Sequence, residues 1–409
     1  MSDISISIPS GESKRLLTGG KYCRADIVVT AEGGVAAPVE EKDVNFYDYD
    51  GTLLYAYTLD ELQALTELPP LPTQPGLICQ GWNWTLEDLK EYAKPYDVMP
   101  YYITEDSATW YDLENDIGRD VEVTFRWKQY GEVVTLDFGD GSEPYSNPPG
   151  VSGVVVTVKH TYAPGNYRAK LSGFYHVGNT DNATAISDIT DSSSTLLKRI
   201  FFGRYPRLLY SKSFVNCFKL STVAVSTYAQ ISSAQGISGC RNLKALLVNP
   251  HEGKTGSGAF SDNSSLKVVS IPNGFTSWYG SAGNRSLKRL CLPDSLTVAN
   301  GGPGDSDAMT YTNIPNGYAS IPPYAFQRCY SLPELTIPVG VTSIGASAFN
   351  TCSSLMTLRF LPTEPPAVAN ANAFTGIPTL CRVEVPAASL EAYQNATNYA
   401  SIAAQMVGV

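Results

Sequence analysis

Few residues of this chain have the types and the spacing that enzymes use. The 409-residue sequence contains three histidines, His160, His176 and His251, and none lies near a cysteine or serine in a recognisable nucleophile motif. The motif G-x-S-x-G, which places a serine nucleophile on a sharp turn, is absent. We therefore predict that the chain has no catalytic residue and is not an enzyme.

Three short motifs imitate phosphate-binding or metal-binding sites but are incomplete. Gly253-Lys254-Thr255 resembles the end of a phosphate-binding loop, yet Val248 stands where that loop requires a glycine. Asp137-Phe138-Gly139 spells the metal-binding triplet of kinases without their glycine-rich or catalytic loops. Asp48-x-Asp50-Gly51 lacks the closing glutamate of a calcium loop, and no C-x-x-C pair could hold zinc. We expect no cofactor and no metal.

The composition is that of an acidic globular protein. Hydrophobic residues make up 43% of the chain and charged residues 17%, and the net charge is −10. No cluster of Lys and Arg provides the basic footprint of a nucleic-acid-binding protein. No apolar run reaches the length of a membrane span, and the alternating start Ile4-Ser5-Ile6-Ser7-Ile8 is a strand pattern rather than a signal peptide. We therefore expect neither a nucleic-acid partner nor export by the general secretory route.

The C-terminal half repeats itself about every 23 residues. Hydrophobic residues follow the repeat anchors at the third and fifth positions, with Thr312 as the one exception, which is the L-x-x-L-x-L spacing of leucine-rich repeats. The anchors are Leu197, Leu220, Leu243, Leu266, Leu287, Met309, Leu332, Leu355 and Leu380. One such unit cannot bury its apolar face alone, so we predict that residues 193–409 form a solenoid whose coils share one core.

A small polar or thiol side chain stands three residues before most anchors. These positions are Cys217, Cys240, Asn263, Asn284, Ser306, Cys329 and Cys352. We interpret them as one buried column of free structural thiols and amides. Successive coils lie about 5 Å apart, so the distance also leaves open a disulfide between neighbouring coils.

The N-terminal half is predicted to contain three small units. Residues 1–36 alternate like a small β unit, and residues 44–118 combine a hairpin with short helices, the first of them capped by Thr58. Residues 119–176 show four strand patterns and turn signals typical of a small antiparallel sandwich. The predicted fold is therefore mainly β, with small N-terminal domains followed by the solenoid.

The repeats resemble a known family. The pattern Ala325-Phe326-x-x-Cys329-x-Ser331-Leu332-x-x-Leu335-x-Ile337-Pro338 is similar to the BspA-like leucine-rich repeat family, although Ser281 and Pro303 replace its phenylalanine. The resemblance implies a protein of microbial surfaces that functions in adhesion and in binding proteins or matrix, not in catalysis.

Three further resemblances concern the N-terminal half. Leu136–Ser142 and His160–Tyr167 are similar to the motifs of PKD-type immunoglobulin-like domains, which are spacers in extracellular proteins. We interpret the Asp-Gly pair there as a tight turn, and a calcium role for Asp137 or Asp140 stays open. Residues 46–82 resemble the β-grasp-like repeats of bacterial surface proteins. Residues 8–31 are similar to N-terminal segments of phage and prophage minor structural proteins, including tail-fibre components.

Side chains that point outward from the repeat strands form two different surfaces. In the first half they are mostly apolar, and we predict that they pack on the preceding domain or on another subunit: Phe201, Ala224, Leu247 and Val268. In the second half they are polar, and we predict that they face solvent or a ligand: Arg289, Tyr311, Asn313, Glu334, Thr336, Arg359 and Arg382. An unselected solvent-facing surface is the alternative for this second set.

The combined expectation is a non-enzymatic attachment protein. We expect a phage or prophage virion protein, such as a tail fibre, a receptor-binding protein or a decoration protein. Its N-terminal segment would bind virion or tail proteins, and its repeats would bind a host surface protein or glycan. The alternative is an adhesin on the bacterial cell surface. Analogy with fibre proteins adds a possible homotrimer.

Overall fold

The protein is described by a computed structural model. The model describes residues 39–130, 133–147, 152–173, 185–191, 196–203, 207–208, 214–227, 230–231, 237–248, 260–278, 280 and 282–409. The chain divides into two compact units, Met1–Glu40 and Glu41–Val409, and every described helix and strand lies in the second unit. The expected β unit at residues 1–36 lies outside the described residues.

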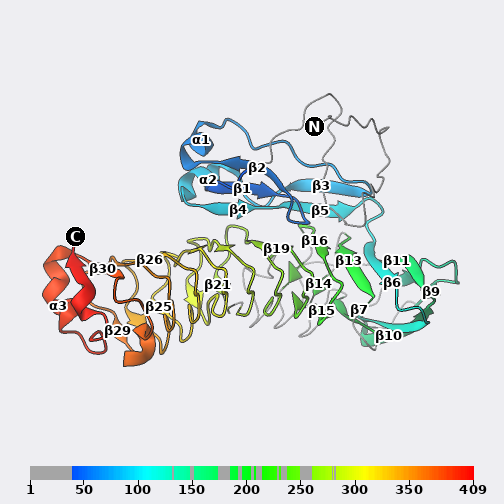
Figure 1. Ribbon diagram of the computed structural model, residues 1–409. Helices are drawn as coiled ribbons and strands as arrows, with labels where there is room; N and C mark the ends of the chain where they lie inside the picture. Colours follow the sequence, from blue (N-terminus) through cyan, green and yellow to red (C-terminus); the bar gives the residue numbers. More distant parts are fainter. Residues whose placement is uncertain are drawn as a thin grey trace, which may run out of the picture. The chain divides into compact units, whose positions relative to one another are not determined.

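A small α+β module comes first (Figure 1). One sheet has the strand order β2-β1-β4, and β3 pairs with β5 in a second sheet. Thr58 caps the first helix with a reciprocal hydrogen bond to Glu61, as the sequence predicts. The elements are β1 (Val44–Tyr47), β2 (Leu53–Tyr57), α1 (Leu59–Ala64), β3 (Leu77–Trp82), α2 (Leu86–Tyr92), β4 (Tyr96–Val98) and β5 (Pro100–Thr104).

A β-sandwich follows the module. Its strands are β6 (Thr109–Asn115), β7 (Val121–Tyr130), β8 (Thr135–Asp137), β9 (Tyr145–Ser146), β10 (Ser152–Tyr162), β11 (Gly165–Ser172) and β12 (Ala185–Asp191). The sequence places a domain boundary at residues 118/119, but the sandwich begins earlier. The reason is that β6 pairs along its whole length with β11, so it belongs to a sandwich sheet. No local pattern in β6 indicates this partner, because the pairing is long-range.

The sandwich and the solenoid share both of their sheets. β13 (Leu197–Phe201) pairs with β6 on one side and with β16 (Thr222–Ala224) on the other. The opposite sheet runs from β7 through β12 to β14 (Arg207–Leu208) and β17 (Gln230–Ile231). The sandwich thus covers the N-terminal end of the solenoid core, which would otherwise expose an unpaired edge.

The solenoid presents a series of parallel strands on one face, which we call the front strands. They are β13, β16, β19 (Ala245–Leu247), β20 (Val268–Ser270), β22 (Arg289–Leu290), β24 (Tyr311–Thr312), β26 (Glu334–Ile337), β28 (Thr357–Phe360) and β30 (Arg382–Val385). On the opposite side, β14 and β17 are followed by the short strands β21 (Ser277–Trp278), β23 (Val298–Ala299), β25 (Ser320–Ile321), β27 (Ser343–Ile344) and β29 (Ala367–Val368), and β15 (Phe214–Val215) pairs with β18 (Ile237–Ser238) in a separate sheet.

The predicted column of anchors is confirmed for eight of the nine positions. The anchors from Leu197 to Leu355 are all buried in one hydrophobic cluster. The prediction is wrong for the ninth anchor, Leu380, because this residue is 82% exposed. Cys381 takes its place: the Cys381 N–H donates to the Pro378 carbonyl as the Leu355 N–H does to Cys352, and Cys381 is buried. The last coil has one residue fewer between anchor and strand, which repeat spacing alone does not reveal.

The column of cysteine and asparagine side chains satisfies backbone groups inside the coils. Asn263 receives a hydrogen bond from the Cys240 N–H (2.8 Å) and donates to the carbonyls of Ile237 and Phe260 (both 2.9 Å). The Cys352 thiol donates to the Phe326 carbonyl (3.1 Å). Buried backbone carbonyls require partners, and this column supplies them.

The C-terminal end is closed by a short cap. It consists of the helices η1 (Ala371–Phe374), η2 (Ala387–Ser389), α3 (Leu390–Gln394) and η3 (Ala403–Gln405) and the strand β31 (Met406–Gly408). β31 extends the last front sheet by pairing with β30. Tyr393 and Tyr399 are buried and donate their hydroxyl hydrogens to the carbonyls of Pro362 and Pro366.

Candidate binding surface

The α+β module packs directly on the first half of the front strands. Phe201 lies edge-to-face against Tyr49, with ring centroids 5.8 Å apart, and contacts Trp110. Ala224 belongs to the same hydrophobic cluster. Leu247 and Val268 are buried in the main cluster, which also contains Tyr47 and Met99 of the module. These are the four residues for which the sequence predicts a domain or subunit contact.

Polar groups of the module also reach the backbone of the solenoid. The Trp84 indole N–H donates to the Ile271 carbonyl (2.9 Å), and the Ile271 N–H donates to the Tyr96 hydroxyl (3.1 Å). Tyr92 donates its hydroxyl hydrogen to the Leu292 carbonyl (2.6 Å). The module therefore satisfies backbone groups that a bare solenoid would leave to water.

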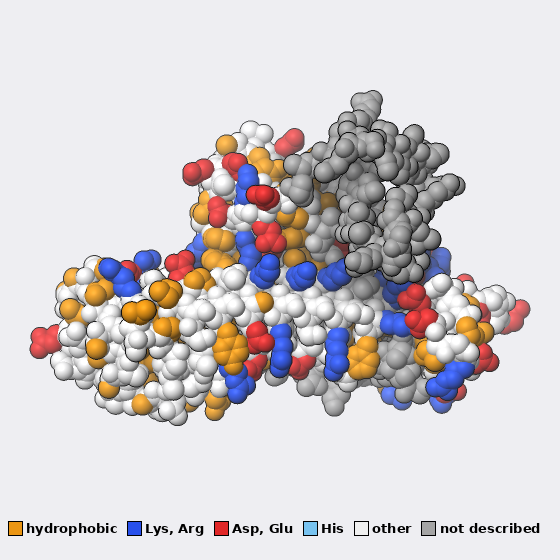
Figure 2. Space-filling model, viewed as in Figure 1, with side chains coloured by type: hydrophobic (Ala, Val, Ile, Leu, Met, Phe, Trp, Pro, Cys, Tyr) orange, Lys and Arg blue, Asp and Glu red, His pale blue; other side chains and the backbone are white. Residues whose placement is uncertain are grey.

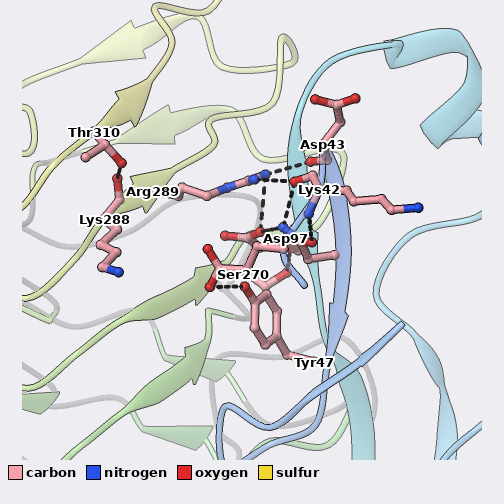
Figure 3. Close-up of polar contacts among 10 residues, drawn as sticks. Lys42, Asp43, Tyr47, Asp97, Ser270, Lys288, Arg289 and Thr310 are labelled. Atoms are coloured by element: carbon pink, nitrogen blue, oxygen red, sulfur yellow. Dashed lines mark hydrogen bonds and ion pairs between the residues drawn. The ribbon is translucent and has the colours of Figure 1, made fainter. Parts of the chain in front are cut away.

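Arg289 lies within this contact rather than on an open surface (Figure 3). Its guanidinium donates to the carbonyls of Lys42 (2.7 Å) and Asp43 (2.6 Å). It also forms an ion pair with Asp97 at 3.3 Å, and the Arg289 side chain is only 14% exposed. The sequence groups Arg289 with a ligand-binding face. Arg289 is buried because the module covers the front strands as far as β22. The repeat period does not predict how many front strands the module covers.

Burial changes the proton affinity of the groups around Arg289. It raises the pKa of Asp97 to about 6, although Arg289 and a hydrogen bond from Asn45 act in the opposite direction. It also raises the pKa of the Cys291 thiol to about 12, with the Asp97 charge acting in the same direction. Cys291 is therefore a buried thiol that packs against the module and not a reactive group.

Beyond the module the front strands are open. The side chains of Glu334, Thr336, Arg359 and Arg382 are exposed. Arg359 and Arg382 both donate to one carboxylate, that of Glu384, at 2.6 and 2.8 Å. The Glu384 side chain is only 11% exposed, and the hydrogen bonds from Arg359 lower its pKa. This clamp holds two arginines in fixed positions on β28 and β30.

A cleft of about 350 Å³ lies at the boundary between the covered and the open parts. Five of the seven residues predicted to form a ligand-binding face line it, namely Tyr311, Asn313, Glu334, Thr336 and Arg359. Arg289 and Arg382 lie outside this lining. The volume is at the lower end of the range for small-ligand sites.

The cleft also contains residues that the sequence pattern does not single out. The module contributes Lys94, which forms an ion pair with Asp294. Asn316 and Leu361 come from the turns after the front strands. The outward positions of the repeat strands do not include these residues, because two lie outside the strands and Lys94 lies outside the repeats.

The acidic turn of the sandwich is satisfied internally. Asp137 accepts from the Gly139 N–H (2.8 Å), and Asp140 accepts from the Ser142 N–H (3.0 Å), as the tight-turn interpretation predicts. Burial alone would raise the pKa of Asp140, but hydrogen bonds from Ser142 and His160 lower it to about 2. Among the residues that the structure describes, no group of three His, Cys, Asp or Glu side chains could hold a metal ion.

The surface chemistry is that of a binding protein. On the face shown in Figure 2, Lys and Arg side chains form rows across the middle coils, and hydrophobic side chains gather toward the C-terminal coils. A cleft that combines a tyrosine, amides, a carboxylate, a lysine and an arginine can donate and accept hydrogen bonds and pack on an apolar group. In the described part of the chain, every helix falls short of the length and hydrophobicity of a membrane-spanning segment.

Comparison with known proteins identifies the repeats. Residues 180–300 and 305–404, slightly more than half of the chain, match the family model described as "BspA type Leucine rich repeat region" in six copies. No curated protein matches the sequence. Two solved structures are similar at low identity. One is a leucine-rich repeat protein from Bacteroides ovatus (15% identity, 51% of this chain and 76% of that chain, TM-score 0.30). The other is a leucine-rich cell surface protein from Faecalibacterium prausnitzii (17% identity, 57% and 94%, TM-score 0.27).

Proposed function

We propose, from the premise that the chain belongs to the BspA-type leucine-rich repeat family, that it is a non-enzymatic attachment protein whose front cleft binds a surface ligand. A leucine-rich repeat solenoid is a scaffold for binding, because stacked coils present an extended surface and bury the rest of each repeat in the core. The adhesive role implied by the family resemblance agrees with the incomplete state of every catalytic motif in the sequence.

The cleft is the observation that carries this proposal. It joins side chains of three neighbouring coils with one side chain of the module, so that its lining exists only in the folded, assembled chain. Arg359 is held in place by Glu384, and Asn313 donates to the Leu292 carbonyl at 2.7 Å. Side chains that are fixed before the ligand arrives lose little conformational entropy on binding.

The ligand class is a host surface protein or glycan. A binding screen of the full chain against arrays of host glycans and surface proteins tests this proposal. Arg359→Ala removes a cleft side chain and should weaken binding about tenfold, because one charge-assisted hydrogen bond is lost. Arg285→Ala is the matched control, since Arg285 is 71% exposed and lies outside the cleft lining. Equal binding by both variants would contradict the proposal.

The location of the protein separates two forms of the proposal. In the first it is a phage or prophage virion protein, attached to virion or tail proteins through residues 1–36, and a homotrimer by analogy with fibre proteins. In the second it is an adhesin of the bacterial cell surface. Mass spectrometry of purified phage particles and of proteins released by protease treatment of intact cells distinguishes them, because only one fraction should contain the protein.

A further inference from the structure

The ladder of front strands is interrupted in three places. β13 pairs with β16, β19 with β20, β22 with β24, β26 with β28, and β28 with β30. No pairing joins β16 to β19, β20 to β22 or β24 to β26 within the described residues of these coils. An interrupted ladder leaves backbone N–H and C=O groups that need other partners.

The module supplies partners at the first two interruptions. The Tyr102 N–H, from strand β5, donates to the carbonyl of Val225, which directly follows β16 (2.9 Å). Both backbone groups of Ile271, directly after β20, bond to the module through Trp84 and Tyr96. In this chain, then, another segment makes hydrogen bonds to the solenoid backbone beside two of the three breaks in the front ladder, as it also does beside the paired strand β22 through Tyr92.

The third interruption, between β24 and β26, is the cleft. The edge of β26 forms one wall of the cleft, and no other described segment makes backbone hydrogen bonds to this edge. The Pro333 carbonyl accepts from the Met356 N–H (2.7 Å), and the Ile337 carbonyl accepts from the Leu361 N–H (3.0 Å), so both point toward β28. Backbone groups of successive strand residues point to opposite sides, and those of Glu334 and Thr336 therefore point toward β24. No backbone hydrogen bond joins them to β24 within residues 282–409, all of which are described. On the opposite wall, the buried hydroxyl of Thr312 also has no partner in the described structure.

The two coils that border the cleft are fixed to each other on its flanks. The Asp305 N–H donates to the Gln327 carbonyl (2.7 Å), and the Ser331 hydroxyl donates to the Asp307 carbonyl (2.7 Å). On the far side of the solenoid, β25 pairs with β27. The cleft is thus an opening between coils whose spacing is set elsewhere, which favours a preformed site over a frayed strand.

The charge of the lining indicates the kind of partner. The two basic side chains of the cleft already have acidic partners outside the lining: Lys94 pairs with Asp294, and Arg359 shares the Glu384 carboxylate with Arg382. Glu334 is exposed and makes no hydrogen bond or ion pair within the described structure. The whole chain also carries a net charge of −10. An unpaired carboxylate in an acidic protein attracts a basic partner.

We infer that the cleft binds a short extended peptide segment of a partner protein, by strand addition to the free edge of β26, with a Lys or Arg side chain of that segment against Glu334. Main-chain hydrogen bonds to Glu334 and Thr336 would supply affinity, and the pairing with Glu334 would supply selectivity. This inference rests on the proposed attachment function and narrows its ligand from protein or glycan to an extended basic peptide.

The test is a selection from a combinatorial decapeptide library with the full chain as bait. We expect enriched peptides to be rich in β-branched residues and to contain Lys or Arg. N-methylation of alternate residues in an enriched peptide should weaken its binding about tenfold, through the loss of about one backbone hydrogen bond. Glu334→Gln should weaken binding of Lys-containing peptides while leaving their Lys→Met counterparts unchanged.

A proline variant tests the edge of β26 from the protein side. Thr336→Pro removes an N–H that points into the cleft and keeps the hydrogen bonds to β28, and proline is tolerated at such an edge. It should abolish peptide binding, whereas Thr336→Val, which keeps the N–H, should not. If Thr336→Pro does not fold, the N-methylated peptides decide alone.

The possible outcomes separate this inference from the proposed function. The inference would be overturned if the selection enriched no peptide. It would also be overturned if an enriched peptide bound equally well after N-methylation of its odd-numbered residues and after N-methylation of its even-numbered residues. Arg359-dependent binding of a glycan that no peptide displaces would also overturn it, while leaving the attachment function intact. Peptide binding that fails with Thr336→Pro but persists with Thr336→Val supports it.

Discussion

At the scale of single residues, buried polar groups decide what the molecule tolerates. Asp97 is 2% exposed and lies between the Arg289 guanidinium and the Asn45 amide. A carboxylate in this position loses the solvation that water provides, and its two partners replace that solvation only in part. For this reason the folded protein holds the proton of Asp97 at pH values where the unfolded chain has released it.

Asp97 therefore makes stability depend on pH. Its folded pKa of about 6 exceeds the ordinary value of 3.8, so the folded state binds more protons between these values, and this contribution is lost as pH rises through 6. We expect Asp97→Asn to flatten the pH dependence of the unfolding free energy between pH 4 and 6, by an amount on the order of 2–3 kcal/mol.

Chemical denaturation at several pH values measures this effect. Glu67→Gln removes an exposed carboxyl from the same module and serves as the control, which should retain the wild-type slope. The same slope in Asp97→Asn as in the wild type would show that Asp97 is ionised at the same pH in the folded and unfolded chains.

At the scale of elements, stacked phenylalanines connect the C-terminal coils. Phe349 lies between Phe326 and Phe374, with ring centroids 5.6 and 5.8 Å apart and nearly parallel planes. Each ring comes from a different coil, so the contact repeats at the period of the sequence. A residue of this kind stabilises two coil boundaries simultaneously.

Truncation of the middle ring should be severe. Phe349 is fully buried, and we expect Phe349→Ala to lower the unfolding free energy by about 3–5 kcal/mol through lost burial and a cavity. Met356→Ala in the next coil is the control; Met356 is 52% exposed, and its truncation should cost less than about 0.5 kcal/mol. Thermal and urea unfolding of both variants measure the difference, and similar costs would argue against the shared stack.

At the scale of the whole molecule, the module and the first half of the solenoid form one structural unit. Their side chains belong to common hydrophobic clusters, and Trp84 donates to the solenoid backbone from within the module. The distal coils have no such cover and depend on their neighbours alone. We therefore expect the module to unfold locally together with the coils that it covers, and independently of the C-terminal coils.

Hydrogen–deuterium exchange tests this cooperativity. Trp84 is 3% exposed, so Trp84→Ala should cost about 3–5 kcal/mol and should speed exchange in both β1 and β20. Exchange in β28 and β30 should stay near the wild-type rate. Unchanged protection of β20 would indicate that the module opens independently of the solenoid.

The sequence by itself determined the repeat architecture. The fold class, the column of anchors from Leu197 to Leu355 and the cap at Thr58 follow from short-range patterns, because a coil or a helix turn is stabilised by residues near in sequence. The outward positions of the repeat strands also supply five of the twelve residues that line the cleft.

Only the tertiary structure decided which segment covers the front strands and between which front strands the pairing is interrupted. The membership of β6 in the sandwich, the burial of Arg289, the contribution of Lys94 to the cleft and the break between β24 and β26 all depend on segments far apart in the chain. Such contacts are selected by the fit of whole surfaces, and a repeat period contains no information about which surface will pack against it.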